Sequence, residues 1–201
     1  MTLDCELSLS GHVGRVSRSC FYQLRQLRQI RRTLNDNAAR MLVNAFVISR
    51  IDYCNAIHLG TTSTQIGRIQ RILNSSARLL LRLPKFAHIS LATRNTLHWL
   101  PVSQRVRFKT ILLVWNSLSG KAPSYLRDLC IPLSSIQGRR QLRSSNQTLL
   151  HVPRCRTTTL QKRGFAVAGP STWNALPSGL RSMVGTSTDA DFKRCLKTHL
   201  F

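Results

Sequence analysis

A helical period near the start of the chain is the feature that most constrains its fold. Between residues 13 and 34, apolar side chains recur every three or four positions, which gathers them into one stripe on an α-helix. At about 100° per residue, arginines fall roughly on the opposite face of that helix. The pattern predicts a helix that packs on one side and presents guanidinium groups on the other. The apolar members are Val13, Val16, Cys20, Leu24, Leu27, Ile30 and Leu34, and the arginines are Arg15, Arg18, Arg25, Arg28 and Arg32.

The same design recurs in a second predicted helix that runs from about residue 63 to about residue 83. Thr62 and Gln65 have the spacing of a capping box at its start. An apolar stripe follows, with a basic cluster on the far face. That cluster consists of Arg68, Arg71, Arg78 and Arg82.

A helix over about 38–58 is predicted between these two. Asp36 or Asn37 is expected to cap it, and Gly60 follows its end. Its apolar residues occur all round the helix, so we expect it at the centre of a bundle. Met41, Phe46 and Tyr53 are among them.

The two basic faces contain no acidic residue. Solvated helix faces usually interleave Glu with Lys four residues apart, so that the charges offset one another. Because the repulsion between these arginines has no such compensation, contact with a polyanion is favoured over passive exposure.

The overall charge points to the same class of partner. The 201 residues include 30 Lys and Arg against 7 Asp and Glu, a formal net charge of +23, and 24 of the 30 are Arg. Arginine makes forked hydrogen bonds to phosphate and stacks on exposed bases. RNA, an RNA–DNA hybrid or single-stranded DNA is the expected partner, without a recognisable sequence-reading motif. A basic RNA-binding scaffold protein is an alternative that the composition permits.

The shortage of acids argues against catalysis by this chain. Two-metal phosphoryl or nucleotidyl transfer needs several carboxylates. Residues 53–127 and 129–188 contain no acidic residue, and Asp128 is the one acid between these two stretches. The six cysteines form no C-x-x-C pair, which argues against structural zinc, and are expected to be reduced and mostly buried. We therefore predict no catalytic residue, no metal site and no cofactor.

Changes in composition and hydrophobic patterning along the chain predict three parts. They are an N-terminal extension over 1–12, a helical region over 13–130 and a carboxyl-terminal segment over 131–201. A short helix is expected from Ser90, a longer one from about Ser103 to Leu118, and one or two further helical turns from Ser124 to Leu129. The last part has strand-like runs at 149–152 and 165–168, and a terminal helix capped by Ser187 or Thr188. Trp173 is expected to anchor a small core there. A basic loop adds Arg139, Arg140 and Arg143 to the candidate nucleic-acid contacts.

Two features bear on location. No run approaches the roughly 18 apolar residues that span a bilayer. The first dozen residues contain Asp4 and Glu6 and no Lys or Arg, which is wrong for a secretory signal or an acid-poor transit peptide. We expect an intracellular protein, nuclear or cytoplasmic, with no membrane partner.

Five ordered blocks carry a resemblance to a known family. They are SRIDYCN (49–55), RIQRILNSSARLLLRLPKFAHIS (68–90), LHWLPVSQRVRFKTILLVWNSLSGKAPSYLRDL (97–129), LRSSNQTLLHVPRCRTTTLQKRGFAVAGPSTWNALPSGLRS (142–182) and FKRCLKTHLF (192–201). Together they resemble the carboxyl-terminal part of the reverse transcriptase polyprotein of jockey-like and chicken-repeat-like LINE retrotransposons, which are non-LTR mobile elements. The resemblance runs from about residue 13 to the end of the sequence.

The resemblance implies a mainly α fold, with a helical thumb-like bundle followed by a small, irregular α+β carboxyl-terminal segment. The family activity is RNA-directed DNA polymerase, but the Tyr-x-Asp-Asp motif of its catalytic palm is absent from this sequence. The expected function is that of a noncatalytic remnant that binds nucleic acid, because the family thumb grips the primer and template. Alternatively, the chain is part of a complete reverse transcriptase whose palm lies upstream, and the remainder of that polymerase is then a partner.

Overall fold

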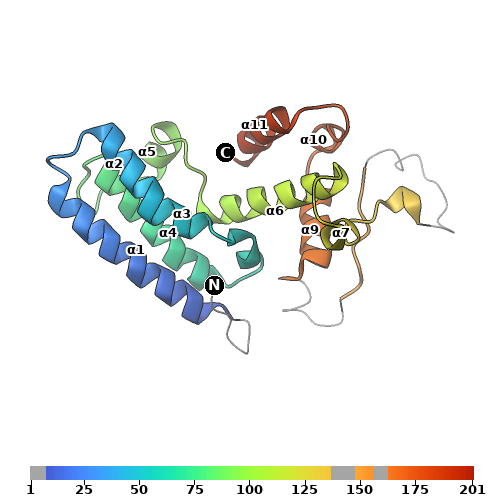
Figure 1. Ribbon diagram of the computed structural model, residues 1–201, viewed down its shortest axis with the longest axis horizontal. Helices are drawn as coiled ribbons and strands as arrows, with labels where there is room; N and C mark the ends of the chain where they lie inside the picture. Colours follow the sequence, from blue (N-terminus) through green and yellow to red (C-terminus); the bar gives the residue numbers. More distant parts are fainter. Residues whose placement is uncertain (1–7, 137–147, 156–162) are drawn as a thin grey trace. The chain divides into compact units, whose positions relative to one another are not determined.

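The computed structural model describes residues 8–136, 148–155 and 163–201 (Figure 1). These residues are mainly α-helical, which confirms the predicted fold class. The chain divides into two compact units, Met1–Arg105 and Val106–Phe201. No helix within the described ranges is long and apolar enough to cross a membrane.

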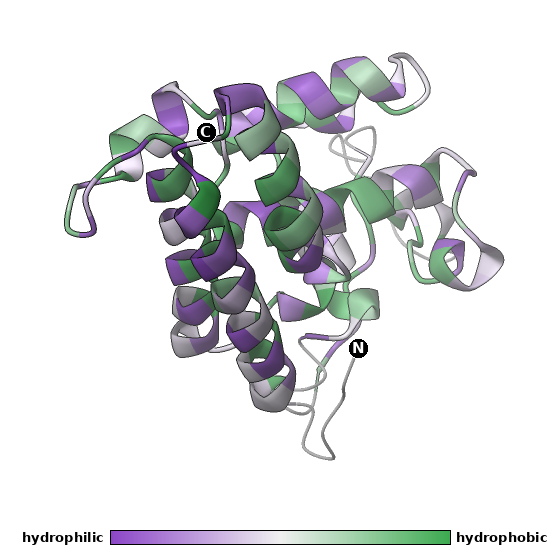
Figure 2. Ribbon diagram, turned by 60° about the vertical axis from the view of Figure 1, so that its left-hand side comes forward, coloured by the Kyte–Doolittle hydropathy of each residue, from purple (hydrophilic) through white to green (hydrophobic). Residues whose placement is uncertain are grey.

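The first unit is built around two long helices. Helix α1 (Ser10–Ile30) packs along α4 (Ser63–Leu80). Between them in sequence come α2 (Asp36–Val43), a π-helical turn η1 (Asn44–Ile48), α3 (Ser49–Asp52) and a 3-10 turn η2 (Asn55–His58). The short helix α5 (Ser90–Asn95) follows α4. Green apolar and purple polar turns alternate along these helices in Figure 2.

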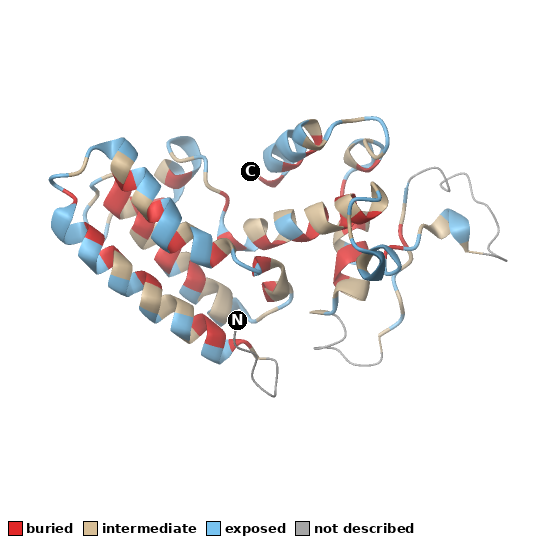
Figure 3. Cartoon of the chain, in the orientation of Figure 1, coloured by how far each residue is buried: buried red, intermediate tan, exposed pale blue. Residues whose placement is uncertain are grey.

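The predicted stripe forms the buried side of α1 except at its end, where Ile30 is 46% exposed and Leu34 lies beyond the helix. Four of its residues are buried: Val13, Cys20, Leu24 and Leu27. Helix α1 packs against α4, whose buried residues include Ile69, Ile72, Leu73 and Ala77. Figure 3 shows the resulting alternation of buried and exposed turns along both helices. The helical period therefore fixed the packing side correctly.

The helix predicted over about 38–58 differs from the structure in three respects. It ends at Asp52 rather than near residue 58, and its cap is Asn35, whose side chain accepts a hydrogen bond from the Ala38 N–H at 2.7 Å. It is also not buried all round, because α1 and α4 cover only one side of it. Val43, Val47 and Ile51 are buried there, whereas Met41, Phe46 and Tyr53 are exposed.

The start and end of α4 also differ in detail from the prediction. Thr62 occupies the expected N-cap position, but its side chain makes no capping hydrogen bond. The helix ends at Leu80, so Arg82 lies beyond it with a left-handed backbone (φ 54°). The position of the Arg82 side chain is therefore not set by the helical repeat of α4.

The second unit contains α7 (Ser124–Arg127), a 3-10 turn η3 (Leu133–Ser135), α9 (Phe165–Asn174), α10 (Ser178–Arg181) and α11 (Asp189–Leu200). The boundary between the two units falls inside α6 (Val102–Leu118). The reason is that Trp115, in the second half of α6, stacks on Phe192 of α11 with ring centroids 3.8 Å apart. That half of α6 therefore belongs to the core of the second unit.

Trp173 anchors this core, as predicted. It is fully buried, its ring centroid lies 6.1 Å from that of Phe192, and its indole Nε1–H donates to the Thr148 carbonyl at 2.9 Å. The predicted cap of the terminal helix is Thr188, whose hydroxyl accepts from the Asp191 N–H at 3.2 Å.

The two strand-like runs do not form strands within the described residues. Residues 165–168 begin α9, where Gly169 allows close contact with Phe165 and Val114. The run at 149–152 makes one isolated antiparallel bridge between Leu150 and Pro132. The Asn174 side chain accepts from the Leu150 N–H at 2.9 Å and donates to its carbonyl at 2.8 Å, which satisfies backbone groups that a neighbouring strand would otherwise bond.

The cysteines are less buried than predicted. Of those described, Cys20 and Cys130 are buried, Cys155 is half-buried, and Cys54 and Cys195 are exposed. All five have free thiols. The prediction of mostly buried thiols is therefore wrong.

Candidate nucleic-acid interface

The basic face of α1 is exposed as the sequence predicts. Arg15, Arg18, Arg25, Arg28 and Arg32 are all exposed. At about 100° per residue they span an arc of about 140° on the side away from the buried stripe. The helix carries no acidic side chain that could offset their charge. This face therefore carries positive charge that no acidic side chain of α1 offsets, with the exposed Phe21 and Tyr22 among the arginines.

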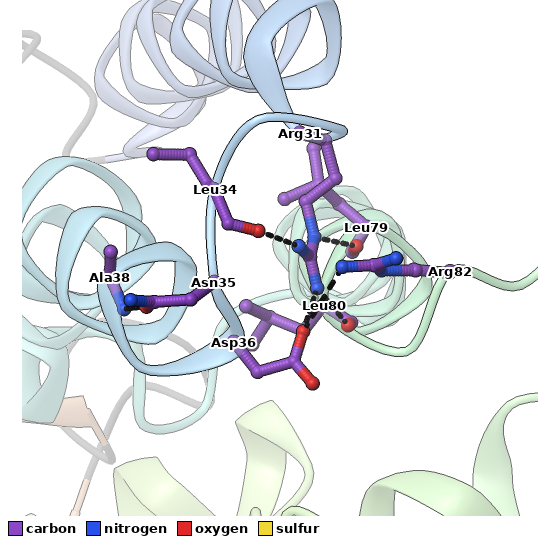
Figure 4. Close-up of polar contacts among 8 residues, drawn as sticks. All are labelled: Arg31, Leu34, Asn35, Asp36, Ala38, Leu79, Leu80 and Arg82. Carbon is purple, nitrogen blue, oxygen red and sulfur yellow. Dashed lines mark hydrogen bonds and ion pairs between the residues drawn. The ribbon is translucent and has the colours of Figure 1, made fainter.

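Arg31 is a buried arginine at the end of this helix, and it was not among the predicted contacts. It is 7% exposed, and its guanidinium donates to three carbonyls: Nε to Leu79 at 3.1 Å, Nη1 to Leu34 at 3.0 Å and Nη2 to Leu80 at 3.0 Å. The last carbonyls of a helix have no partner within it, and Arg31 supplies one for the end of α4 (Figure 4).

The bonds of Arg31 join the carboxyl-terminal ends of α1 and α4. Because the two helices also pack along their lengths, they run parallel. This arrangement brings residues that are far apart in the sequence to one place.

A groove of about 390 Å³ lies between these two helix ends. Five arginines line it together with Leu79 and Leu83, and we call it the arginine groove. The five are Arg28, Arg31, Arg32, Arg78 and Arg82. The structure thus brings together four of the predicted contact residues, two from each basic face.

One carboxylate lies beside the arginine groove. The Asp36 Oδ1 atom is 2.6 Å from Nη2 of Arg31 and 3.5 Å from Nη2 of Arg82. The hydrogen bond from Arg31, with further attraction from the charges of Arg31 and Arg82, holds the pKa of the Asp36 carboxyl below its usual value. Asp36 is therefore ionised at neutral pH and offsets one of the five positive charges.

Arg78 has a structural role as well as a place in the groove. It is half-buried, and its Nε and Nη2 atoms donate to the Ala87 carbonyl at 3.3 and 3.1 Å. These bonds hold the segment after α4 against the helix. Arg28, Arg32 and Arg82, in contrast, are exposed.

The other predicted contacts are distributed over the first unit or fall outside the described residues. Arg18 and Arg25 lie on the outer face of α1, and Arg68 and Arg71 are exposed on α4. Arg15 lines a different groove, with Arg50. Arg139, Arg140 and Arg143 lie outside the described residues.

A signal for the burial of Arg31 exists in the sequence. Position 31 is seven residues after Leu24 and four after Leu27, so it continues the apolar stripe rather than the basic face. An arginine on the packed side of a helix must find acceptors when it is buried. The register indicates burial, but it does not identify those acceptors, because they come from α4.

Two other carboxylates, those of Asp52 and Asp189, make contacts within the fold. Asp52 accepts two hydrogen bonds from Nη1 of Arg105, at 2.8 and 3.1 Å. Asp189 accepts from Lys121 at 2.7 Å and from the Trp115 indole at 2.9 Å. In the part of the chain that the structure describes, no three His, Cys, Asp or Glu side chains are grouped so as to hold a metal ion. The chemistry that the arginine groove offers is positive charge and forked hydrogen-bond donation.

Comparison with known proteins finds no matching family model, no matching curated protein and no matching solved structure. The functional argument therefore depends on the residues of this chain.

Proposed function

We propose that this chain is a noncatalytic thumb-and-tail portion of a LINE-type reverse transcriptase and that it binds nucleic acid through its arginine-bearing helix faces. The arginine groove is the observation that carries the binding proposal. It gathers five guanidinium groups from the ends of α1 and α4 and from the residues that directly follow them. Neither helix contains an acidic residue, and Asp36 of α2 lies at the edge of the groove. Forked donors at this density suit the phosphates of a polynucleotide.

The expected binding is tolerant of sequence. Phosphate contacts position a protein on a polynucleotide and carry no sequence information directly. Because such contacts release counterions, the affinity falls linearly with salt on logarithmic axes, with a slope of about −0.9 per neutralised phosphate for duplex DNA and about −0.7 for single strands. Binding should therefore weaken steeply with salt and differ little between sequences of equal length.

Fluorescence anisotropy with labelled RNA, single-stranded DNA and RNA–DNA hybrid tests the proposal. The groove variant replaces Arg28, Arg32 and Arg82 by Gln and leaves out Arg31 and Arg78, whose hydrogen bonds hold the fold. The matched control replaces Lys109, Lys193 and Lys197 by Gln, three exposed cations of the second unit.

The groove variant should flatten the salt slope by about 2 to 3, and the control should change it by less than about 1. Equal changes in the two variants would mean that the groove is not the contact surface. Absence of binding to all three nucleic acids at low salt would refute the proposed function.

The noncatalytic part of the proposal has a separate test. Primer extension by the purified chain would overturn it, since the family palm motif is absent from the sequence. The reading frame upstream distinguishes the two family alternatives. An open frame that encodes Tyr-x-Asp-Asp would make these residues the thumb and tail of a complete polymerase, whereas a stop codon would make them a remnant.

A further inference from the structure

A second groove lies within the first unit, between α1 and α3. Its volume is about 590 Å³, in the range of small-molecule sites. Arg15 and Ser19 of α1 line it opposite Ser49, Arg50 and Tyr53. We call it the Tyr53 groove.

The lining of the Tyr53 groove combines two kinds of chemistry. Arg15 and Arg50 supply two guanidinium groups, and no acidic side chain lines the groove. Tyr53 supplies an aromatic ring that is 59% exposed, with Val16 and the largely buried His12 as further apolar and aromatic surface. A ligand that matches both parts carries an anionic group and a flat aromatic group.

Contacts around the groove hold these groups in place. Arg50 donates to the hydroxyl of Ser19, which joins α3 to α1. Helix α3 ends at Asp52, whose carboxylate is fixed by Arg105, and Tyr53 follows with an extended backbone (ψ 119°). The ring is therefore presented at the end of a helix that is anchored on both sides, which reduces the ordering cost of a ligand that stacks on it.

We propose that the Tyr53 groove holds one nucleotide with an unpaired base, with Arg15 and Arg50 at its phosphate and the Tyr53 ring against its base. The inference rests on the proposed function and narrows it. A duplex hides the faces of its bases within the stack, whereas a single strand presents them to an aromatic side chain. The groove would thus give the chain a preference for single-stranded segments that phosphate contacts alone do not provide.

A strand without bases isolates the contribution of the Tyr53 groove. The full chain is titrated with labelled oligothymidylate and with a strand of equal length whose central nucleotides are abasic, so that the phosphate charge is the same. Wild type should bind the strand with bases about tenfold or more tightly. Tyr53→Leu should bind both strands equally and keep its salt slope, and Tyr53→Phe should keep the preference.

Tyr125→Leu is the matched control, because Tyr125 is 68% exposed on α7 of the second unit and does not line the groove. This variant should keep the preference for bases. Equal binding of both strands by wild type would overturn the inference and leave the proposed function standing, whereas no binding of either strand would refute the proposed function itself. A preference that survives Tyr53→Leu would also overturn the inference.

The phosphate part of the proposal has its own variant. Replacing Arg15 and Arg50 by Gln should reduce the single-strand salt slope by about 0.7, since the two side chains neutralise one phosphate and each neutralised phosphate contributes about 0.7. An unchanged slope would contradict the assignment of these two side chains to phosphate.

Competition with adenosine monophosphate tests whether the Tyr53 groove binds a free nucleotide or only a nucleotide within a strand. This compound has a base and a phosphate but no strand. Displacement of the labelled strand by this compound, abolished by Tyr53→Leu, assigns the site to free nucleotides as well. Failure to displace, with the preference for bases intact, assigns it to a nucleotide within a strand.

Discussion

The Nη2 atom of Arg31 lies 2.6 Å from the Oδ1 atom of Asp36, and the two side chains differ greatly in burial. The side chain of Arg31 is 8% exposed, whereas that of Asp36 is 76% exposed. The guanidinium therefore depends on the carbonyls of α4 and of Leu34 as well as on the carboxylate. This cluster fixes the end of α1 beside the end of α4, and so it builds the arginine groove.

Arg31→Gln should lower the free energy of unfolding by about 2–4 kcal/mol, because it removes a buried cation that makes four hydrogen bonds and leaves their acceptors unsatisfied. Urea denaturation followed by circular dichroism measures the change. The control is Arg32→Gln, an exposed neighbour, which should alter stability by less than about 0.5 kcal/mol. Equal effects of the two changes would contradict the structural role of Arg31.

Acid should weaken the first unit through Asp36. The hydrogen bond from Arg31 lowers the pKa of this carboxyl in the folded state, so the folded protein binds its proton less readily than the unfolded chain does. The stabilisation is present above the unfolded pKa of about 3.9 and is lost as the pH falls below it. Asp36→Asn should be less stable than wild type at pH near 6, and urea titrations should show the difference shrinking as the pH falls below about 4. A difference that grows with acidity would have the wrong sign.

Two arginines of α4 should separate binding from stability. Arg71 is exposed, so Arg71→Gln should reduce the salt slope for nucleic acid by about 0.7–0.9 and leave unfolding unchanged. Arg78→Gln removes the hydrogen bonds to the Ala87 carbonyl and should cost about 1–2 kcal/mol of stability. Anisotropy titrations and urea denaturation of both variants test this. Identical stability of the two would contradict the bonding of Arg78.

Phe192 should be essential to the second unit. It is fully buried and stacked on Trp115, and Phe192→Ala should destabilise the protein by about 3–5 kcal/mol, since it leaves a cavity beside two tryptophans. Tryptophan fluorescence during urea unfolding reports the loss. Tyr125→Ala, at a 68% exposed aromatic residue of α7, should cost less than about 0.5 kcal/mol.

The cysteines should react in two groups. Burial raises the pKa of the Cys20 thiol to about 11, against a weaker opposing effect of Arg50, so at pH 8 only about 0.1% of it is thiolate. Burial also raises the pKa of Cys130. Iodoacetamide followed by mass spectrometry should label the exposed Cys54 and Cys195 first, and Cys20 and Cys130 only after unfolding. Early labelling of Cys20 in the folded protein would contradict its burial.

The helices with the strongest period were predictable from local sequence. The stripe of α1 and the exposure of its five arginines follow from residues within one helix, and so does the Thr188 cap of α11. The run at 165–168 was not predictable in this way, because four apolar residues fit either a strand or a buried helical turn. The side chain of Asn174, which bonds both backbone groups of Leu150, and the contact of Gly169 with Val114 favour the structure that forms.

The sequence by itself determined which faces of α1 and α4 carry positive charge, since the helical period and the absence of acids are local properties. Only the tertiary structure decided which arginines meet. Arg31 bonds the carbonyls of Leu79 and Leu80, and through them Arg28 and Arg32 come to line one groove with Arg82. The physical reason is that burial and hydrogen-bond partners depend on residues far apart in the chain, which no local pattern encodes.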